Sequence, residues 1–199
     1  MGFSTILDIM ASIIIGGILI TITIRLNDAA TAKTYNNSAE LSLQENMATV
    51  ANMLEIDFRK IGYCADWNKF PDPSKAIVYA DASSIKYLID IDSDTNMDSI
   101  RYFLGPTSEL LSTPNPRDRM LYRVINNETP KTSNLGVTQF RLVYFDALGD
   151  TIAPPVTTPG LINSIEINLA VESVAAYDTA YSSAFWRQIR LVARNLRNR

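Results

Sequence analysis

Histidine is absent from this chain of 199 residues, and cysteine occurs once, as Cys64. Because histidine is the commonest general base and the commonest metal ligand in proteins, catalytic and metal sites built on it are excluded. A single cysteine cannot form a disulfide bond within the chain. With no histidine to activate its thiol, we interpret Cys64 as a small buried apolar residue rather than as a nucleophile.

A strong excess of either charge is also lacking, since 18 basic residues face 21 acidic ones and the net charge is −3. Nucleic-acid binding needs a clustered basic surface, so no nucleic-acid partner is expected. No nucleophile–base pair, carboxylate dyad or haem motif is recognisable, and we expect neither an enzyme nor a cofactor. We interpret the arginines near the C-terminus as the solvated end of a last strand rather than as a phosphate-binding face: Arg187, Arg190, Arg194, Arg197 and Arg199.

Charge is scarcest at the start of the chain, where residues 3–24 carry only one charged side chain, Asp8. As a helix these residues would span roughly 33 Å, enough to cross the ~30 Å hydrocarbon core of a membrane. A cleaved signal peptide is the alternative, but only Met1 and Gly2 precede the apolar run, where a signal peptide has a basic region. The sequence therefore favours an uncleaved membrane anchor.

Proline does not occur before Pro71, and no glycine lies between Gly17 and Gly62. Apolar residues then recur at steps of three or four, which predicts one apolar stripe on an amphipathic helix: Leu43, Met47, Val50, Leu54, Phe58 and Ile61. Gly62 is a suitable residue to stop this helix. We expect one helical rod of about 60 residues, with a leader and transmembrane half at 1–26 and an amphipathic half at 27–62.

The remaining residues, 63–199, predict a globular antiparallel β domain. Apolar residues at 165, 167, 169 and 171 alternate with others, which is typical of a strand with one buried and one mostly wet face. No alternation of helices and strands is visible, which argues against a parallel α/β fold. The fold class is therefore predicted as α+β, with strands at 76–79, 84–91, 99–104, 120–126, 137–146, 163–173 and 185–193.

This layout resembles the type IV pilin and type II secretion pseudopilin superfamily, and most of all its W-type minor pilins and J-type pseudopilins. Residues 2–6 (GFSTI) resemble the family's prepilin peptidase site, and residues 15–19 (IGGIL) are similar to its membrane segment. Residues 54–63 (LEIDFRKIGY) resemble the end of the spine helix in W-type minor pilins. Residues 136–146, 165–169 and 185–195 follow the late strands of both subunit types.

The resemblance implies a pilin-like fold and a structural subunit of a pilus-like or pseudopilus filament, which assembles through its hydrophobic N-terminal helix. The implied partners are copies of itself or other pilins, the prepilin peptidase and pilus assembly machinery, and membrane lipid before assembly. The implied location is the inner (cytoplasmic) membrane, then a cell-surface or extracellular filament. A monomeric, membrane-anchored extracytoplasmic β-domain that binds a ligand or partner is the alternative, and an anchored hydrolase is a distant third.

The resemblance also assigns roles to single residues near the N-terminus. Cleavage after Gly2 and methylation of the new Phe3 amine are implied. The family carries a glutamate at the fifth mature position, which would be Leu7 here, whereas the acid in this chain is Asp8 at the sixth. We expect Asp8 to pair with the N-terminal amine of a neighbouring subunit, the alternative being an aspartate solvated at the membrane interface.

Two further stretches carry hypotheses. Gly16 and Gly17 lower the helix propensity of the membrane segment, so we expect a distorted helix there within a filament. Oxygen-bearing side chains recur at every second residue from the end of the second predicted strand onward, as they do in calcium loops: Asp90, Asp92, Asp94, Asn96 and Asp98. Thr95 and Arg101 replace the glycine and glutamate of an EF-hand, so we favour a polar hairpin loop over a calcium site.

Overall fold

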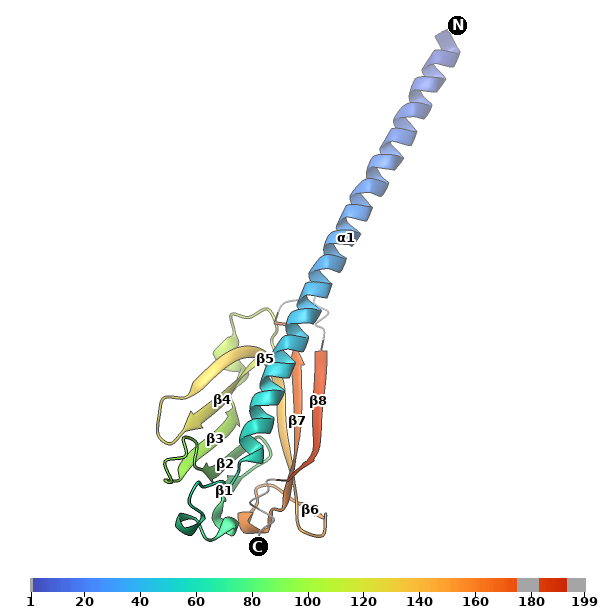
Figure 1. The fold of residues 1–199 in the computed structure, drawn as a ribbon. Helices are drawn as coiled ribbons and strands as arrows, with labels where there is room; N and C mark the ends of the chain where they lie inside the picture. The colour runs from blue at the N-terminus through green and yellow to red at the C-terminus, as the bar shows by residue number, and fades with distance from the viewer. Residues whose placement is uncertain (1, 175–182, 193–199) are drawn as a thin grey trace.

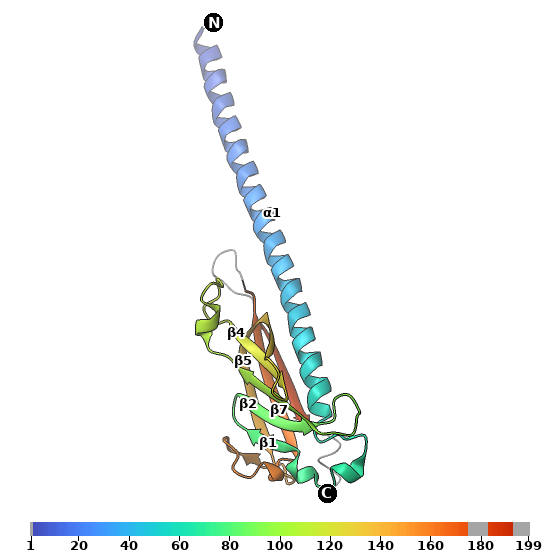
Figure 2. The same ribbon diagram turned by 90° about the vertical axis from the view of Figure 1, so that its left-hand side faces the viewer.

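The computed structural model describes residues 2–174 and 183–192, and it has an α+β fold with a pilin-like layout. One helix, α1 (Gly2–Arg59), is 58 residues long and continues far beyond the sheet at its N-terminal end (Figure 1). Its C-terminal part crosses one face of an antiparallel sheet, as the view turned by 90° also shows (Figure 2). The predicted single helical rod is therefore confirmed.

The helix ends in a tight turn that directs the chain towards the sheet. Arg59 is its last residue, and the amide of Tyr63 donates a hydrogen bond to the carbonyl of Lys60 at 2.8 Å. Gly62 has a φ of 73°, a left-handed conformation that costs glycine little, as expected for the residue that stops the helix. Its amide donates to the carbonyl of Leu88 at 2.8 Å, so the chain joins the sheet as soon as it leaves the helix.

Within the described residues the sheet has eight strands, all paired antiparallel, in the order β1-β2-β3-β4-β5-β7-β8 with β6 beside β5. The strands are β1 (Ile77–Ala80), β2 (Ser84–Ile89), β3 (Asp98–Leu104), β4 (Arg119–Ile125), β5 (Lys131–Phe145), β6 (Thr151–Ile152), β7 (Ser164–Glu172) and β8 (Ser183–Leu191). Two short 3₁₀ turns, η1 (Trp67–Lys69) and η2 (Pro73–Lys75), lie between α1 and β1. A third, η3 (Thr107–Leu110), follows β3, and η4 (Pro159–Leu161) precedes β7.

The seven predicted strands are all present, and most of their ends lie within two residues of the prediction. The main difference is β5, which begins at Lys131 rather than at residue 137, because its first residues pair with β4. The short strand β6 was not predicted, since two residues are too few to establish an alternating pattern.

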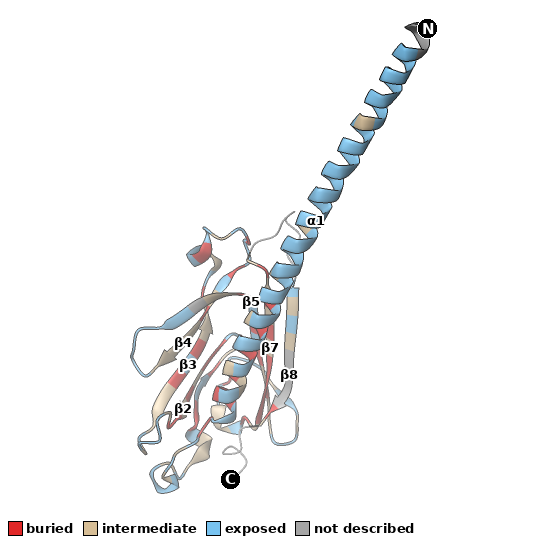
Figure 3. Cartoon of the chain, turned by 45° about the horizontal axis from the view of Figure 1, so that its top comes forward, coloured by how far each residue is buried: buried red, intermediate tan, exposed pale blue. Residues whose placement is uncertain are grey.

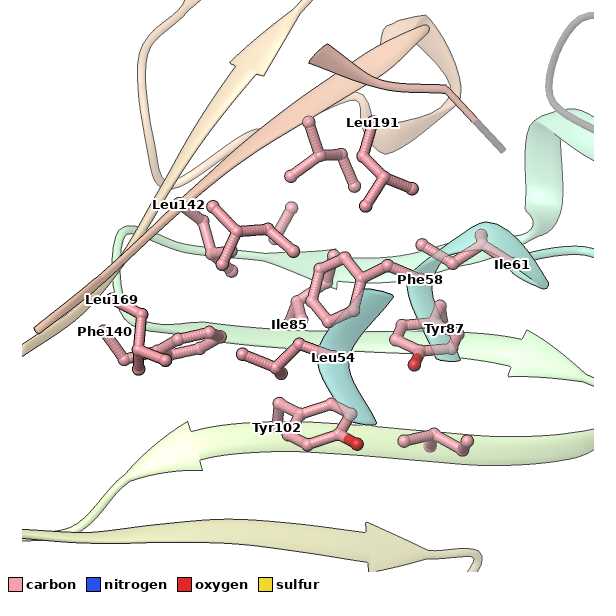
Figure 4. Packing of buried hydrophobic residues seen from close by; sticks show 14 of the residues in the cluster. Leu54, Phe58, Ile61, Ile85, Tyr87, Tyr102, Phe140, Leu142, Leu169 and Leu191 are labelled. Carbon is pink, nitrogen blue, oxygen red and sulfur yellow. The ribbon is translucent and has the colours of Figure 1, made fainter. Parts of the chain in front are cut away.

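The apolar stripe of α1 and one face of the sheet form the core. All six predicted stripe residues are buried: Leu43, Met47, Val50, Leu54, Phe58 and Ile61. Phe58 packs against two buried tyrosines of the sheet, with ring centroids 5.6 Å from Tyr87 and 5.8 Å from Tyr102 (Figure 4). Each fully buried side chain of this size contributes about 1.5–3 kcal/mol of hydrophobic free energy, which attaches the helix to the sheet.

Strand β7 corrects one expectation about the outer face of the sheet. Ile165, Ile167, Leu169 and Val171 are buried as predicted. The opposite face is not mostly wet, because Glu166 is only 5% exposed, Ser164 is also buried, and the remaining residues of that face are half-buried. The cause is position: β7 lies between β5 and β8, so side chains of both strands flank it.

Candidate functional site

The N-terminal part of α1 is an exposed apolar surface, coloured almost entirely as exposed in Figure 3. Its large apolar side chains are between 47% (Ile22) and 68% (Ile13) exposed: Ile6, Leu7, Ile9, Met10, Ile13, Ile14, Ile15, Ile18, Leu19, Ile20, Ile22, Ile24 and Leu26. We call residues 6–26 the exposed apolar segment. By length and composition α1 can cross a membrane, and none of its most apolar stretch is buried.

Most polar side chains of the exposed apolar segment are satisfied within the helix itself. The hydroxyls of Ser12, Thr21 and Thr23 donate to carbonyls one turn earlier, at 2.8, 2.9 and 2.9 Å. Asp8 differs, because its carboxylate is exposed and no ion pair joins it to any described residue. The segment thus presents one carboxylate on a largely apolar surface, whose other charged residue, Arg25, lies near its C-terminal end.

The other predicted N-terminal site residues lie on the same helix. Gly2 is the first residue of α1 and Phe3 follows it. Gly16 and Gly17 are helical, and an added Cβ atom would meet nothing within 4 Å at either position. The single chain is therefore helical through both glycines. The distortion was expected within a filament, so it stays a prediction.

A polar network beneath the helix joins α1 to the sheet. Asp57 Oδ2 accepts hydrogen bonds from Arg123 Nε at 2.7 Å and from the Tyr102 hydroxyl at 2.5 Å. Burial, together with the negative charge of Asp57, raises the pKa of Tyr102 well above its usual range, so its hydroxyl keeps its proton and acts as a donor. Hydrogen bonds to a charged acceptor are the stronger kind, so this network fixes the helix on β3 and β4.

The polar network was missed from the sequence, although a signal for it exists. Asp57 lies three residues after Leu54 and four before Ile61, so helical spacing places it on the buried stripe itself. An acid on a buried stripe predicts a cationic or hydrogen-bonding partner. Which residue would be that partner was not readable, because Arg123 is 66 residues further along the chain.

A cavity of about 510 Å³ lies beside the network, between α1 and the β4–β5 pair. Most of its lining is apolar and comes from both sides: Val50, Met53 and Ile56 on the helix, and Leu121, Leu135 and Val137 on the strands. Asp57 and Arg123 line it as well. The cavity therefore combines an apolar wall with a compensated charge pair.

The predicted oxygen-rich stretch occupies the β2–β3 loop and the first residue of β3, and the structure gathers three of its five residues. One carboxylate oxygen from each of Asp90, Asp92 and Asp98 lies within 4.8 Å of the others. Asp94 is not among these three, and it bonds to Asn96 instead, accepting from the backbone and side-chain nitrogens of Asn96 at 2.7 and 2.8 Å. These hydrogen bonds lower the pKa of the Asp94 carboxyl.

The remaining predictions concern Cys64 and the C-terminal arginines. Cys64 is half-buried, and its thiol donates weakly to the Thr95 carbonyl at 3.7 Å, next to the β2–β3 loop. Arg187 and Arg190 lie on β8, the last described strand, as predicted. Arg194, Arg197 and Arg199 lie outside the described residues.

Comparison with known proteins adds no relative. No protein-family model, no curated protein and no solved structure matches this chain. The likeness to pilins is therefore one of layout: a long apolar N-terminal helix followed by an antiparallel sheet.

Proposed function

We propose that this protein is a structural subunit of a type IV pilus-like or pseudopilus filament. The observation that carries the proposal is the exposed apolar segment, which belongs to the same helix as the buried stripe. An exposed apolar surface of this length is unfavourable in water, so it needs lipid or other apolar helices around it. A helix that is half covered by its own sheet and half uncovered suits a subunit that first sits in a membrane and then packs with copies of itself.

In this mechanism the exposed apolar segments bundle at the filament centre and the sheets coat the outside. Before assembly the segment lies in the inner membrane; afterwards the filament is at the cell surface or extracellular. Cleavage between Gly2 and Phe3 by the prepilin peptidase would place a new amine near the start of the helix. A carboxylate inside such a bundle needs a partner, so the Asp8 carboxylate of one subunit would pair with the amine of the next and set their axial register.

The direct test is to shear surface filaments from cells that express the chain, examine them by electron microscopy and identify their subunits by mass spectrometry. We expect this chain in the sheared material, with an intact mass that lacks Met1 and Gly2 and includes one methyl group. Membrane-inserted chain measured in the same cells controls for expression. If all of the chain stays in the membrane and keeps Met1, the proposal is wrong.

A second candidate function is a monomeric membrane-anchored β-domain that binds a ligand or partner. The apolar cavity between α1 and the β4–β5 pair favours it, since ligand sites are commonly apolar cavities with a few polar groups. A photoreactive amino acid in place of Ile13, in the exposed apolar segment, distinguishes the two. A filament subunit gives crosslinks between copies of the chain, whereas a monomeric anchor gives lipid adducts only. Leu148, an exposed residue of the sheet domain, is the matched control position.

A further inference from the structure

Asp90, at the start of the β2–β3 loop, is an enclosed carboxylate that is only partly satisfied. The residue is 1% exposed. Its Oδ2 atom accepts hydrogen bonds from the amides of Ala65 and Thr95, at 3.0 and 3.1 Å. Its Oδ1 atom is also enclosed and has no hydrogen-bond partner among the described residues. Buried oxygens are nearly always paired, so this one points to a missing partner.

The same carboxylate belongs to a cluster of three. One oxygen each from Asp90, Asp92 and Asp98 lies within 4.8 Å of the other two. The other two carboxylates, of Asp92 and Asp98, accept hydrogen bonds from neutral groups. Asp92 accepts from the Asp94 amide, and Asp98 accepts from the Ile91 amide and the Asn126 side chain. Three like charges at this spacing repel one another unless a cation lies among them.

The described basic residues do not supply that cation. None of the ion pairs among the described residues involves Asp90, Asp92 or Asp98. The acids in those ion pairs are Glu55, Asp57, Asp72, Glu128 and Glu172. Lys69, which lies beside the loop, donates to the Thr95 hydroxyl at 2.5 Å instead. The partner that fits is therefore a free cation with a preference for oxygen ligands.

We propose that the β2–β3 loop and the start of β3 bind one calcium ion through the carboxylates of Asp90, Asp92 and Asp98. Calcium binds oxygen at roughly 2.3–2.6 Å, so two oxygens on one ion lie at most about 5 Å apart, in agreement with the cluster. Magnesium demands near-ideal octahedral geometry and usually keeps several waters, so a site with three protein carboxylates, one of them enclosed, suits calcium better. The exposed side of the cluster, at Asp92, leaves room for water to complete the coordination.

A bound ion would strengthen the attachment of the segment that follows α1 to the sheet. Asp90 bonds the segment after α1 twice, since its own amide donates to the Tyr63 carbonyl at 2.8 Å and its Oδ2 accepts from the Ala65 amide. An ion bound to the Asp90 carboxylate would therefore link the β2–β3 loop more firmly to the segment that follows α1. This role does not depend on filament assembly.

The test is thermal unfolding of the full-length chain in detergent micelles, after EDTA treatment and dialysis. About 10 mM calcium chloride exceeds the ~10⁻⁴–10⁻³ M dissociation constants of extracellular calcium modules, so it should saturate the site. We expect calcium to raise the melting temperature by several degrees. We expect a smaller rise with the same concentration of magnesium chloride and none with sodium chloride of equal ionic strength. Unchanged melting at about 10 mM calcium would overturn the proposal.

Isothermal titration with calcium chloride of two single variants locates the site. Asp92→Asn removes a cluster carboxylate at an exposed position, so the fold is preserved while the affinity for calcium falls at least tenfold. Asp94→Asn removes the same charge from the same loop but lies outside the cluster, so its affinity stays within twofold of the parent protein. Equal losses in the two variants would mean a diffuse charge effect and would overturn the assignment.

Discussion

The two halves of α1 differ in what covers their apolar side chains. In the half that crosses the sheet, most large apolar residues form one stripe, and the sheet buries that stripe, while Leu41 and Ile56 lie outside it and are exposed. In the exposed apolar segment, large apolar residues surround the whole helix, and no described part of the chain covers them. A stripe needs one partner surface, whereas an all-round apolar helix needs a surrounding medium, so only the first half can be completed within one molecule.

Asp8→Ala is expected to have the largest effect of the variants that test this difference, and it alters the exposed half alone. If Asp8 pairs with a neighbouring amine, removing it leaves a buried charge at a cost of about 3–5 kcal/mol, which lowers assembly more than a hundredfold. Asp8→Asn should be intermediate, and Asp8→Glu should be tolerated. The measurement is sheared filament per cell, relative to membrane-inserted chain. Normal filaments from Asp8→Ala would leave Asp8 as an interfacial residue only.

Truncating one leucine in each half measures the two environments directly. Leu54→Ala removes a fully buried side chain and should destabilise the packed domain by about 2–5 kcal/mol. Leu19→Ala makes the same chemical change in the exposed apolar segment, where it should leave the unfolding of the packed domain within about 0.5 kcal/mol of the parent protein. Denaturant unfolding in detergent, followed by tryptophan fluorescence, compares them. Similar losses in both variants would mean that the two halves are energetically coupled.

The polar network tests what holds the packed half besides its apolar stripe. Arg123→Met leaves the buried Asp57 carboxylate without its cation and should cost about 3 kcal/mol, near the lower end of values for broken buried pairs. Tyr102→Phe removes one hydrogen bond to the same carboxylate and should cost less, about 1.5 kcal/mol. Both are read from denaturant unfolding. A double variant with Asp57→Asn should recover part of the Arg123→Met loss, because no uncompensated charge then remains.

The smallest expected effect concerns Asp118, a buried acid of the sheet domain. Burial raises the pKa of its carboxyl, and the nearby Thr113 and Asn134 side chains offset only part of that rise. The folded chain therefore holds this proton more tightly than the unfolded chain. Its contribution to stability is most favourable below the unfolded pKa and is lost as the pH rises through the folded pKa.

Asp118→Asn should consequently raise the melting temperature at pH 7 by about 2–4 °C, equivalent to about 1 kcal/mol. The gain should shrink as the pH falls towards 3.8, the ordinary pKa of the group. Melting curves between pH 4 and pH 8 measure this difference. A gain that stays constant across this range would mean that the carboxyl does not titrate there, contrary to the prediction.

Much of the fold was predictable because its patterns are local. The spacing of Leu54 and Phe58 along the helix predicts a buried stripe, whichever surface that stripe packs against. Glu166 shows where such reasoning failed. Its strand alternates as a half-exposed strand should, yet the residue is buried, because β5 and β8 flank β7 on both sides. Alternation reports which residues share a face but not how deeply each face is covered.

The candidate sites divide in the same way. Asp8 was recognisable from the sequence because one charge within an apolar run needs no knowledge of the fold. Asp57 carried a signal in its spacing, but its partner Arg123 did not. For the β2–β3 loop, the spacing of acids was visible, yet it did not distinguish the three residues that converge from the two that bond to each other.

The sequence by itself determined the length of the helix, its two kinds of surface, the positions of most strands and the lone acid of the exposed apolar segment. These follow from hydrogen bonding and side-chain periodicity between residues close in the chain. Only the tertiary structure decided the Asp57–Arg123 pair, the burial of Glu166 and the convergence of Asp90, Asp92 and Asp98. Each depends on the path by which the chain returns to the same place, and local periodicity does not encode that path.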